Sequence, residues 1–302
     1  MKDLIIIGGG PAGLTAGIYG IRAGLDLIII EKISPGGQVV NSYEIENYPG
    51  FANPISGWDL MEAMEEQTRR LGAEIISAEV VSVKKDAGFF MVELSNGEIQ
   101  GKSVIVAAGT ANRKLNIPGE KEYLGRGVSY CATCDGAFFK EKITVVVGGG
   151  DAALEEADFL TRFADKVYLV HRRDQFRGAE ILQRRVSNNK KIIPVLNTIV
   201  ESINGEGKVG SVILKDNGSG ETKKLDTDGV FVFVGFDPNS AFLDDRLLNA
   251  NREIIVDASM QTEIPGLFAA GDIRSGSKRQ IVTAAADGAT AALNAYEYLK
   301  TN

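Results

Sequence analysis

The chain has 302 residues, of which 44% are hydrophobic and 24% charged, and its formal net charge is −7. These values are typical of a globular protein with about two domains. The acidic balance argues against a nucleic-acid partner, because binding phosphates needs an excess of Lys and Arg. No apolar run reaches the roughly 18 residues of a membrane helix, and Asp3 lies where a signal peptide carries positive charge. We therefore expect a cytoplasmic protein without membrane association.

Residues 4–32 have the pattern of a βαβ unit. An apolar run, a glycine turn, a helix-period stretch and a second apolar run follow one another in LIIIGGGPAGLTAGIYGIRAGLDLIIIEK. The turn contains Gly8-x-Gly10-x-x-Gly13. The first glycine permits the tight turn, the second lets a pyrophosphate approach the backbone, and the third allows helix–strand contact. Glu31, at the end of the second run, would accept hydrogen bonds from ribose hydroxyls.

Both cysteines of the chain lie in the segment SYCATCDGAFF, after a Pro- and Gly-marked crossing at residues 112–120. A structural zinc site takes four Cys or His ligands. The chain offers Cys131, Cys134 and one histidine, so it could complete such a site only with carboxylates or a partner. A bridge over two residues removes little unfolded-state entropy, which disfavours a structural staple. A redox pair fits best.

A second βαβ unit, TVVVGGGDAALEEADFLTRFADKVYLVHRR, repeats the first from Thr144. Its glycine turn reads Gly148-x-Gly150-x-x-Ala153. Alanine is small enough for the third position. Two copies of this fingerprint, each between apolar runs, indicate two dinucleotide sites.

The end of the second strand distinguishes the two copies. Where the first copy has Glu31, the second has His171, followed by Arg172, Arg173 and Arg177. Arginine matches phosphate oxygens bidentately, so this site should prefer NADP(H) to NAD(H). The alternative is a solvated charge cluster at the start of a helix.

The C-terminal stretch contains a strand ending near Asp272 and an Ala-rich helix beginning near Ile281. Such a helix N-terminus can stabilise negative charge on a bound ring or phosphate. Asp272 could equally be an ordinary cap. We expect the tail to return to the first domain, so that the second domain is an insertion. The predicted fold class is α/β, with two Rossmann-like dinucleotide-binding domains, the second inserted into the first.

The chain resembles the low-molecular-weight bacterial thioredoxin reductases over essentially its full length. The segments that carry the resemblance include GGGPAGLTAGIY, GGQVVNSYEIENYPGF, GVSYCATCDGAFF, HRRDQFRGAEIL and FAAGDIRSGSKRQIVTAAADG. The resemblance implies a homodimeric flavoprotein that passes electrons from NADPH through FAD to oxidised thioredoxin. Residues 1–112 with 241–302 would form the FAD-binding domain, and residues 113–240 the NADPH-binding domain with the CxxC pair.

The resemblance also implies roles for individual residues. FAD would be held by Gly8, Gly10, Gly13, Glu31, Gly37, Gln38, Asn47, Asp272, Arg279, Gln280 and Ile281. NADPH would be held by Gly150, Asp151, Ala152, His171, Arg172, Arg173 and Arg177. Cys134 would lie against the flavin, and Cys131 would attack the protein disulfide.

Asp135 directly follows the CxxC pair, with no histidine nearby in sequence. It can therefore supply or remove protons. The alternative is a helix N-cap for the segment that follows.

Two other functions stay open from the sequence. One is a reductase of the same build that acts on another dithiol: a glutaredoxin-like protein, a peroxidase subunit or a small molecule. The other is an NADPH or redox sensor without turnover. Partner choice depends on surfaces that motifs do not describe.

Overall fold

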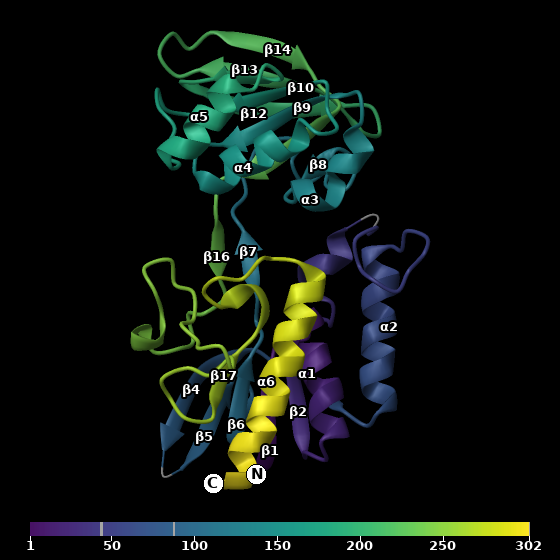
Figure 1. Ribbon diagram of the computed structural model, residues 1–302, viewed down its shortest axis with the longest axis vertical. Coiled ribbons are helices and arrows are strands. Elements are labelled where there is room, and N and C mark those ends of the chain that lie inside the picture. Colours follow the sequence, from purple (N-terminus) through teal and green to yellow (C-terminus); the bar gives the residue numbers. More distant parts are fainter. Residues whose placement is uncertain (43–44, 87, 302) are drawn as a thin grey trace. The chain divides into compact units, whose positions relative to one another are not determined.

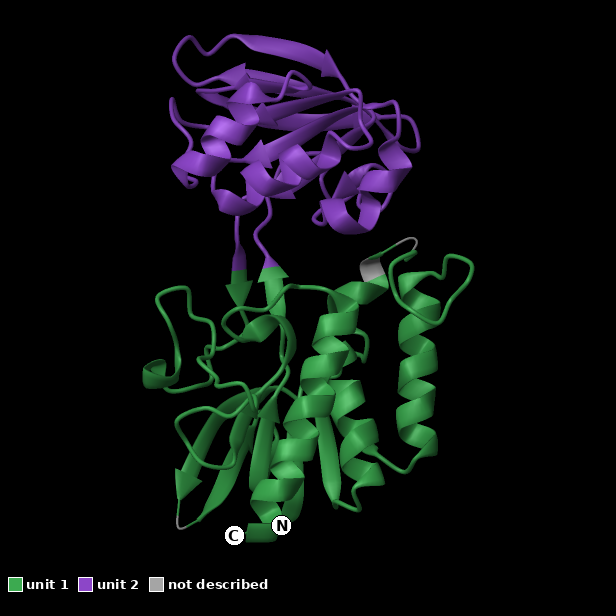
Figure 2. Ribbon diagram, in the orientation of Figure 1, with its two compact units in different colours: residues 1–111, 237–302 green, residues 112–236 purple. Residues whose placement is uncertain are grey.

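The computed structural model describes residues 1–42, 45–86 and 88–301, except for the side chain of Asn41. The chain divides into two compact units (Figure 2). Unit 1 comprises Met1–Ala111 and Asp237–Asn302, and unit 2 comprises Asn112–Phe236. The sequence analysis placed the two boundaries after residues 112 and 240. The chain passes between the units along β7 (Thr110–Asn112) and β16 (Phe236–Pro238), which pair in a two-stranded sheet.

Unit 1 is built on a seven-stranded sheet in the order β3-β2-β1-β6-β5-β4, with β17 paired to β6 (Figure 1). Its neighbours are parallel from β3 to β6 and at β17, and antiparallel from β6 to β4. The strands are β1 (Lys2–Ile7), β2 (Leu27–Glu31), β3 (Glu74–Ser77), β4 (Val80–Asp86), β5 (Phe89–Leu94), β6 (Gly97–Val106) and β17 (Leu267–Ala269).

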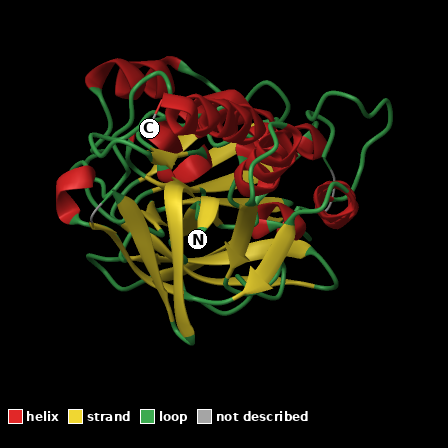
Figure 3. Cartoon of the chain, turned by 90° about the horizontal axis from the view of Figure 1, so that it is seen from below, coloured by secondary structure: helices red, strands yellow, loops and turns green. Residues whose placement is uncertain are grey.

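Helices cover one face of this sheet. They are α1 (Pro11–Arg22), α2 (Gly57–Arg70) and α6 (Ile281–Thr301). Unit 1 also contains the short 3-10 turns η1 (Gly37–Asn41), η3 (Asp245–Leu247) and η4 (Gly271–Ile273), and Leu247 and Ile273 pack in the core cluster on the opposite face. Figure 3 shows the red helices gathered along one side of the yellow strands. Strand β1 alternates accordingly: Leu4 and Ile6 pack with the helices, and Ile5 and Ile7 with the opposite core cluster.

Unit 2 is built on a five-stranded parallel sheet in the order β11-β10-β9-β15-β8, with a three-stranded antiparallel sheet β12-β13-β14. The strands are β8 (Val128–Ser129), β9 (Ile143–Gly148), β10 (Lys166–Val170), β11 (Ile192–Val195), β12 (Thr198–Gly205), β13 (Val209–Asp216), β14 (Thr222–Asp226) and β15 (Gly229–Phe233). Its helices are α3 (Ala132–Asp135), η2 (Gly136–Phe139), α4 (Asp151–Leu160) and α5 (Glu180–Asn188).

The predicted α/β fold class and both βαβ units are confirmed. Strand β1 pairs in parallel with β2 across α1, and β9 pairs in parallel with β10 across α4. The third fingerprint position of the first copy must be small because the backbone of the glycine turn lies against it. A Cβ on Gly13 would lie 1.8 Å from the carbonyl oxygen of Gly8. No helix in the described part of the chain is long and apolar enough to cross a membrane.

A buried ion pair ties the segment after β17 to α6. Arg274 donates from Nε to Asp287 Oδ2 at 2.7 Å and from Nη2 to Oδ1 at 2.8 Å. The backbone N–H of Gly271 also donates to Asp287 Oδ2, at 3.1 Å. Asp287 is only 6% exposed, so its charge depends on these partners.

We expect Asp287→Ala to lower the free energy of unfolding of unit 1 by about 3–5 kcal/mol, because it leaves a buried guanidinium unpaired. Glu297→Ala on the same helix should cost less than about 1 kcal/mol, because its ion pair with Lys300 is exposed. Denaturant titrations followed by far-UV circular dichroism and by the single Trp58, which lies on α2, measure both. Equal losses in the two variants would contradict the prediction.

Candidate functional site

The first dinucleotide cradle lies where β1 turns into α1. Gly8 has φ +110, and a Cβ there would lie 2.3 Å from the Ala107 carbonyl oxygen. Gly10 is the N-cap of α1, and it makes no side-chain cap hydrogen bond. The first helical amides therefore keep their donors for an anion, which the helix dipole also favours. This arrangement fits a pyrophosphate.

Glu31 lies beside this turn, at the end of β2. Its Oε2 accepts from the Gly9 N–H at 2.7 Å, and its Oε1 accepts from the Ile33 N–H at 3.1 Å. The two bonds hold the carboxylate at the edge of the glycine loop, and each oxygen keeps a lone pair for another donor. The position fits a ribose diol.

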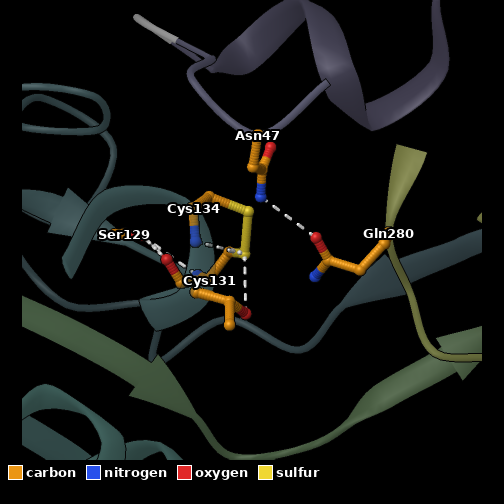
Figure 4. The surroundings of a disulfide bond; sticks show 6 residues. Asn47, Ser129, Cys131, Cys134 and Gln280 are labelled. Atoms are coloured by element: carbon orange, nitrogen blue, oxygen red, sulfur yellow. Dashed lines mark hydrogen bonds between the residues drawn. A yellow bond between two sulfur atoms is a disulfide. The ribbon is translucent and has the colours of Figure 1, made fainter. Parts of the chain in front are cut away.

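The other predicted flavin residues of unit 1 come from three segments. Gly37, with φ +59, would place a Cβ 3.4 Å from the Gly10 Cα, so η1 runs close to the cradle. Asn47 Nδ2 donates to Gln280 Oε1 at 3.2 Å, which joins positions 233 residues apart (Figure 4). Gln38 is exposed within η1.

The remaining three precede or begin α6. Asp272 Oδ1 accepts from Ser277 Oγ at 3.1 Å, and burial raises the pKa of its carboxyl. Arg279 donates from Nη2 to Glu253 Oε1 at 3.2 Å, and Ile281 is the first residue of α6. Asp272 makes no side-chain cap bond to η4, because the N-cap position there is Ala270. Taken together, the predicted residues of unit 1 suit a dinucleotide that carries a polar ring.

The second cradle lies where β9 turns into α4. Gly150 is the N-cap of α4 without a side-chain cap bond, and a Cβ there would meet nothing within 4 Å. Asp151 Oδ1 accepts from the Ala179 N–H at 2.7 Å, and the Gly149 carbonyl accepts from the Arg177 N–H at 2.7 Å. These bonds join the glycine turn to the segment after β10. Ala152 follows, exposed on the first turn of α4.

His171 directly follows β10 and lies against this turn. A Cβ on Gly149 would lie 2.3 Å from two atoms of its ring. Its Nε2 is buried and has no hydrogen-bond partner among the described residues. Burial is the main cause that lowers the pKa of the imidazole, followed by the charges of Arg177, Arg173 and Arg172. The ring is therefore neutral near pH 7.

Arg172, Arg173 and Arg177 are exposed, and within the described residues no ion pair with an acid is found for them. Unpaired guanidinium groups beside an open helix N-terminus fit a ligand with several phosphate groups. The donor set of unit 2 therefore suits a phosphorylated dinucleotide.

Cys131 and Cys134 form a disulfide at the N-terminus of α3 (Figure 4). Cys131 is the N-cap of this helix, and its Sγ accepts from the Cys134 N–H at 3.2 Å. Ser129 Oγ accepts from the Cys131 N–H at 3.0 Å. An amide aimed at the sulfur would stabilise a thiolate there after reduction.

Asp135 ends α3, and burial raises the pKa of its carboxyl, while a hydrogen bond with Ser129 lowers it. Its side chain makes no cap bond to η2. The sequence allowed two roles for Asp135, a proton carrier or a helix N-cap. The hydrogen bond that an N-cap would make is not found among the described residues. A buried carboxyl with a raised pKa next to a disulfide can hold a proton.

Two carboxylates near the cysteines were missed from sequence. Glu120 is 4% exposed and accepts from Tyr130 Oη at 2.8 Å. Glu156 lies on α4, and the backbone N–H groups of Ala132 and Thr133 lower the pKa of its carboxyl. Glu156 is three residues after buried Ala153, a spacing that could have placed it on the packed face of α4.

Comparison with known proteins agrees with this geometry. Residues 2–288 match the family model described as pyridine nucleotide-disulphide oxidoreductase. The chain belongs to this family.

The chain is also similar to individual members. It is 46% identical to the thioredoxin reductase of Treponema pallidum (strain Nichols) over 299 residues, covering 99% of this chain and 97% of that protein. It is 47% identical to the thioredoxin reductase of Bacillus subtilis (strain 168) over 300 residues, covering 99% and 95%. The crystal structure of thioredoxin reductase from Streptococcus pyogenes MGAS5005 matches with a TM-score of 0.96 and 43% identity, covering 100% of this chain and 99% of that chain. The family uses a flavin and a nicotinamide cofactor, and the predicted membership is confirmed.

We expect Asp135→Asn to raise thermal stability more at neutral than at acidic pH. Because burial raises the pKa of this carboxyl in the folded state, its favourable contribution is fully present below the unfolded value of 3.8 and is lost as pH rises through the higher folded pKa. At neutral pH the buried charge opposes folding, and asparagine removes it. Differential scanning fluorimetry at both pH values measures the effect, with exposed Asp226→Asn as control. A variant less stable than wild type at neutral pH would contradict the expectation.

Proposed function

We propose that this chain is a thioredoxin-disulfide reductase that takes electrons from NADPH, passes them through FAD to the Cys131–Cys134 disulfide, and delivers them to oxidised thioredoxin. FAD is assigned to unit 1 and NADPH to unit 2. The similar proteins named above support the substrate, because their names specify thioredoxin reductase. A homodimer and a cytoplasmic location belong to the same proposal: the first rests on the sequence resemblance, and the second on the charge and hydropathy pattern of the sequence.

One observation carries the proposal. A disulfide lies at a helix N-terminus, followed directly by a buried carboxyl, in the same unit as an arginine-rich dinucleotide cradle. A structural disulfide needs neither of these neighbours. A dithiol that is repeatedly reduced needs a stabilised thiolate and a nearby proton carrier.

The charged side chains at each cradle indicate which cofactor binds there. Glu31 places a carboxylate where a 2′-phosphate would be repelled, so unit 1 favours the unphosphorylated adenosine of FAD. Unit 2 has a neutral histidine and three exposed arginines at the matching place, so it favours NADPH. When both are bound, the nicotinamide and the flavin supply a two-electron path from a hydride donor to the disulfide.

The chain's own groups act on the sulfur atoms. Reduction by two electrons and two protons converts the disulfide into two thiols. Loss of one proton from Cys131 gives a thiolate, which the Cys134 N–H at 3.2 Å stabilises. That thiolate attacks the partner disulfide to form a mixed disulfide, which Cys134 then resolves, leaving the partner as a dithiol. Asp135 takes up and returns the proton.

The redox role of the cysteines is tested by Cys131→Ser and Cys134→Ser. In both variants NADPH-driven reduction of thioredoxin should fall to background, because exchange needs two sulfur atoms. NADPH oxidation with quinones should partly survive, because it bypasses the disulfide. A coupled assay with a chromogenic disulfide measures the first activity, and NADPH absorbance measures the second. Thioredoxin turnover at the wild-type rate in either variant would overturn the proposed function.

The phosphate preference is tested by the double variant Arg172→Ala, Arg173→Ala. We expect KM for NADPH to rise roughly ten- to hundredfold, since a charge-assisted hydrogen bond contributes about 1.5–3 kcal/mol. KM for NADH should stay unchanged, because that cofactor lacks the 2′-phosphate. Arg184→Ala serves as control, since Arg184 is exposed on α5 and pairs with Glu180. Equal changes for NADPH and NADH would contradict the assignment.

A further inference from the structure

Glu156, on α4, is a half-buried carboxylate that the chemistry above does not use. The backbone N–H groups of Thr133 and Ala132 lower the pKa of its carboxyl, which places them beside it. Both amides belong to the first turn of α3, the helix that Cys131 caps. The second carboxylate oxygen, Oε2, is buried without a partner among the described residues. Such a group is rare in folded proteins and calls for an explanation.

Packing fixes α3 against α4 at this place. Ala132 is fully buried in one core cluster with Ala153 and Ala157 of α4. A Cβ on Gly136, just after α3, would lie 3.2 Å from Leu160 Cδ2 at the end of α4. Because both contacts leave little room, α3 and α4 keep a fixed spacing, and the backbone of Glu156 stays beside α3.

Cys131 and Glu156 therefore depend on neighbouring backbone amides of α3. Cys131 Sγ accepts from the Cys134 N–H at 3.2 Å, and the amides of Thr133 and Ala132 lower the pKa of the Glu156 carboxyl. After reduction, a thiolate at Cys131 would add a second negative charge beside the Glu156 carboxylate. Like charges at one place disfavour each other's ionised form.

We propose that Glu156 is a positioning residue. It makes the Cys131 thiol less acidic, and the disulfide harder to reduce, than they would be if only the backbone amides of α3 acted on them. The proposal rests on the redox role of the disulfide stated above. Two electrons and two protons convert the disulfide into two thiols, and ionisation of Cys131 then releases one proton. The Glu156 carboxylate, on α4 beside the first turn of α3, opposes that ionisation. A less stable thiolate means a lower reduction potential, so the dithiol passes its electrons on more readily.

In the part of the chain that the structure describes, no positive charge contributes to the pKa of the Glu156 carboxyl. Burial and then the neighbouring charge of Glu155 raise the pKa of the Glu156 carboxyl, and only the two amides lower it. Within the described residues no Lys or Arg forms an ion pair with it. From α3, the titratable groups are Cys131, Cys134 and Asp135, whose own carboxyl pKa is raised by burial.

The test compares Glu156→Gln with wild type. Glutamine keeps an oxygen for the amides and removes the charge. We expect the pH profile of Cys131 alkylation to move about one pH unit lower. The equilibrium with dithiothreitol, whose two thiols supply the two electrons and two protons, should shift about tenfold toward the protein dithiol, or about 30 mV for a two-electron couple. Holoenzyme in anaerobic dithiothreitol buffers, trapped by alkylation and quantified by mass spectrometry, gives both values.

Two further variants separate charge from structure. Glu156→Asp keeps the charge but is one methylene shorter, so we expect it to stay within about threefold of the wild-type equilibrium. Glu155→Gln, on the exposed neighbour, should also stay close to wild type. Wild-type values in Glu156→Gln, or a tenfold shift in Glu156→Asp, would overturn the proposal. The dithiothreitol assay contains neither NADPH nor thioredoxin. Its result is therefore independent of whether the protein reduces thioredoxin with NADPH.

Discussion

Helices α1 and α4 begin without a side-chain cap, and each starts at the glycine turn of a predicted dinucleotide cradle. The first amides of a helix need acceptors, which Ser, Thr, Asp or Asn usually supply. Here Gly10 and Gly150 occupy the cap positions and supply none. Parallel strands carry each helix N-terminus to the carboxyl edge of a sheet, where ligands of such folds bind. The amides therefore remain available to a phosphate, and this requirement explains why the glycines stand where they do.

The two dinucleotide cradles are similar, and one position near the end of the neighbouring strand gives them different ligand preferences. Glu31 is fixed by the Gly9 amide at 2.7 Å, so its charge is held at the loop rather than in solvent. His171 lies so close to Gly149 that any side chain there would strike its ring. Burial and three arginines keep that ring neutral. The contrast arises from local electrostatics, because the backbone of the two turns is nearly the same.

Local patterns predicted most of the fold, and contacts between distant segments explain what they missed. The βαβ units followed from apolar periodicity. The helical periodicity of GWDLMEAMEEQTRRLGA predicts a helix within residues 57–73, and α2 ends at Arg70 because Gly72 adopts φ +101 and breaks the helix.

The site shows the same division between local and distant contacts. The Asn47–Gln280 bond joins residues 233 apart, which spacing alone cannot reveal. Glu156 was missed because two adjacent glutamates in a helix usually face solvent, and only the packing of α3 on α4 shows that one does not. Which of these positions hold a cofactor stays a prediction from the resemblance.

The CxxC segment is held by core contacts on both sides, and these contacts limit the chain entropy that is gained each time the disulfide is reduced. Before it, Tyr130 donates to the buried Glu120, which also accepts from the Leu115 and Asn116 amides at 2.8 and 2.7 Å. After it, Phe139 packs edge-on against Phe231 at 5.0 Å between ring centroids. Opening a disulfide normally frees the chain around it, and that gain in entropy favours the reduced form. With both flanks fixed in the core of unit 2, little freedom is gained on reduction. The energy of each redox cycle then depends mainly on the charges around the sulfur atoms, which is why the carboxylates near α3 matter more than the length of the loop.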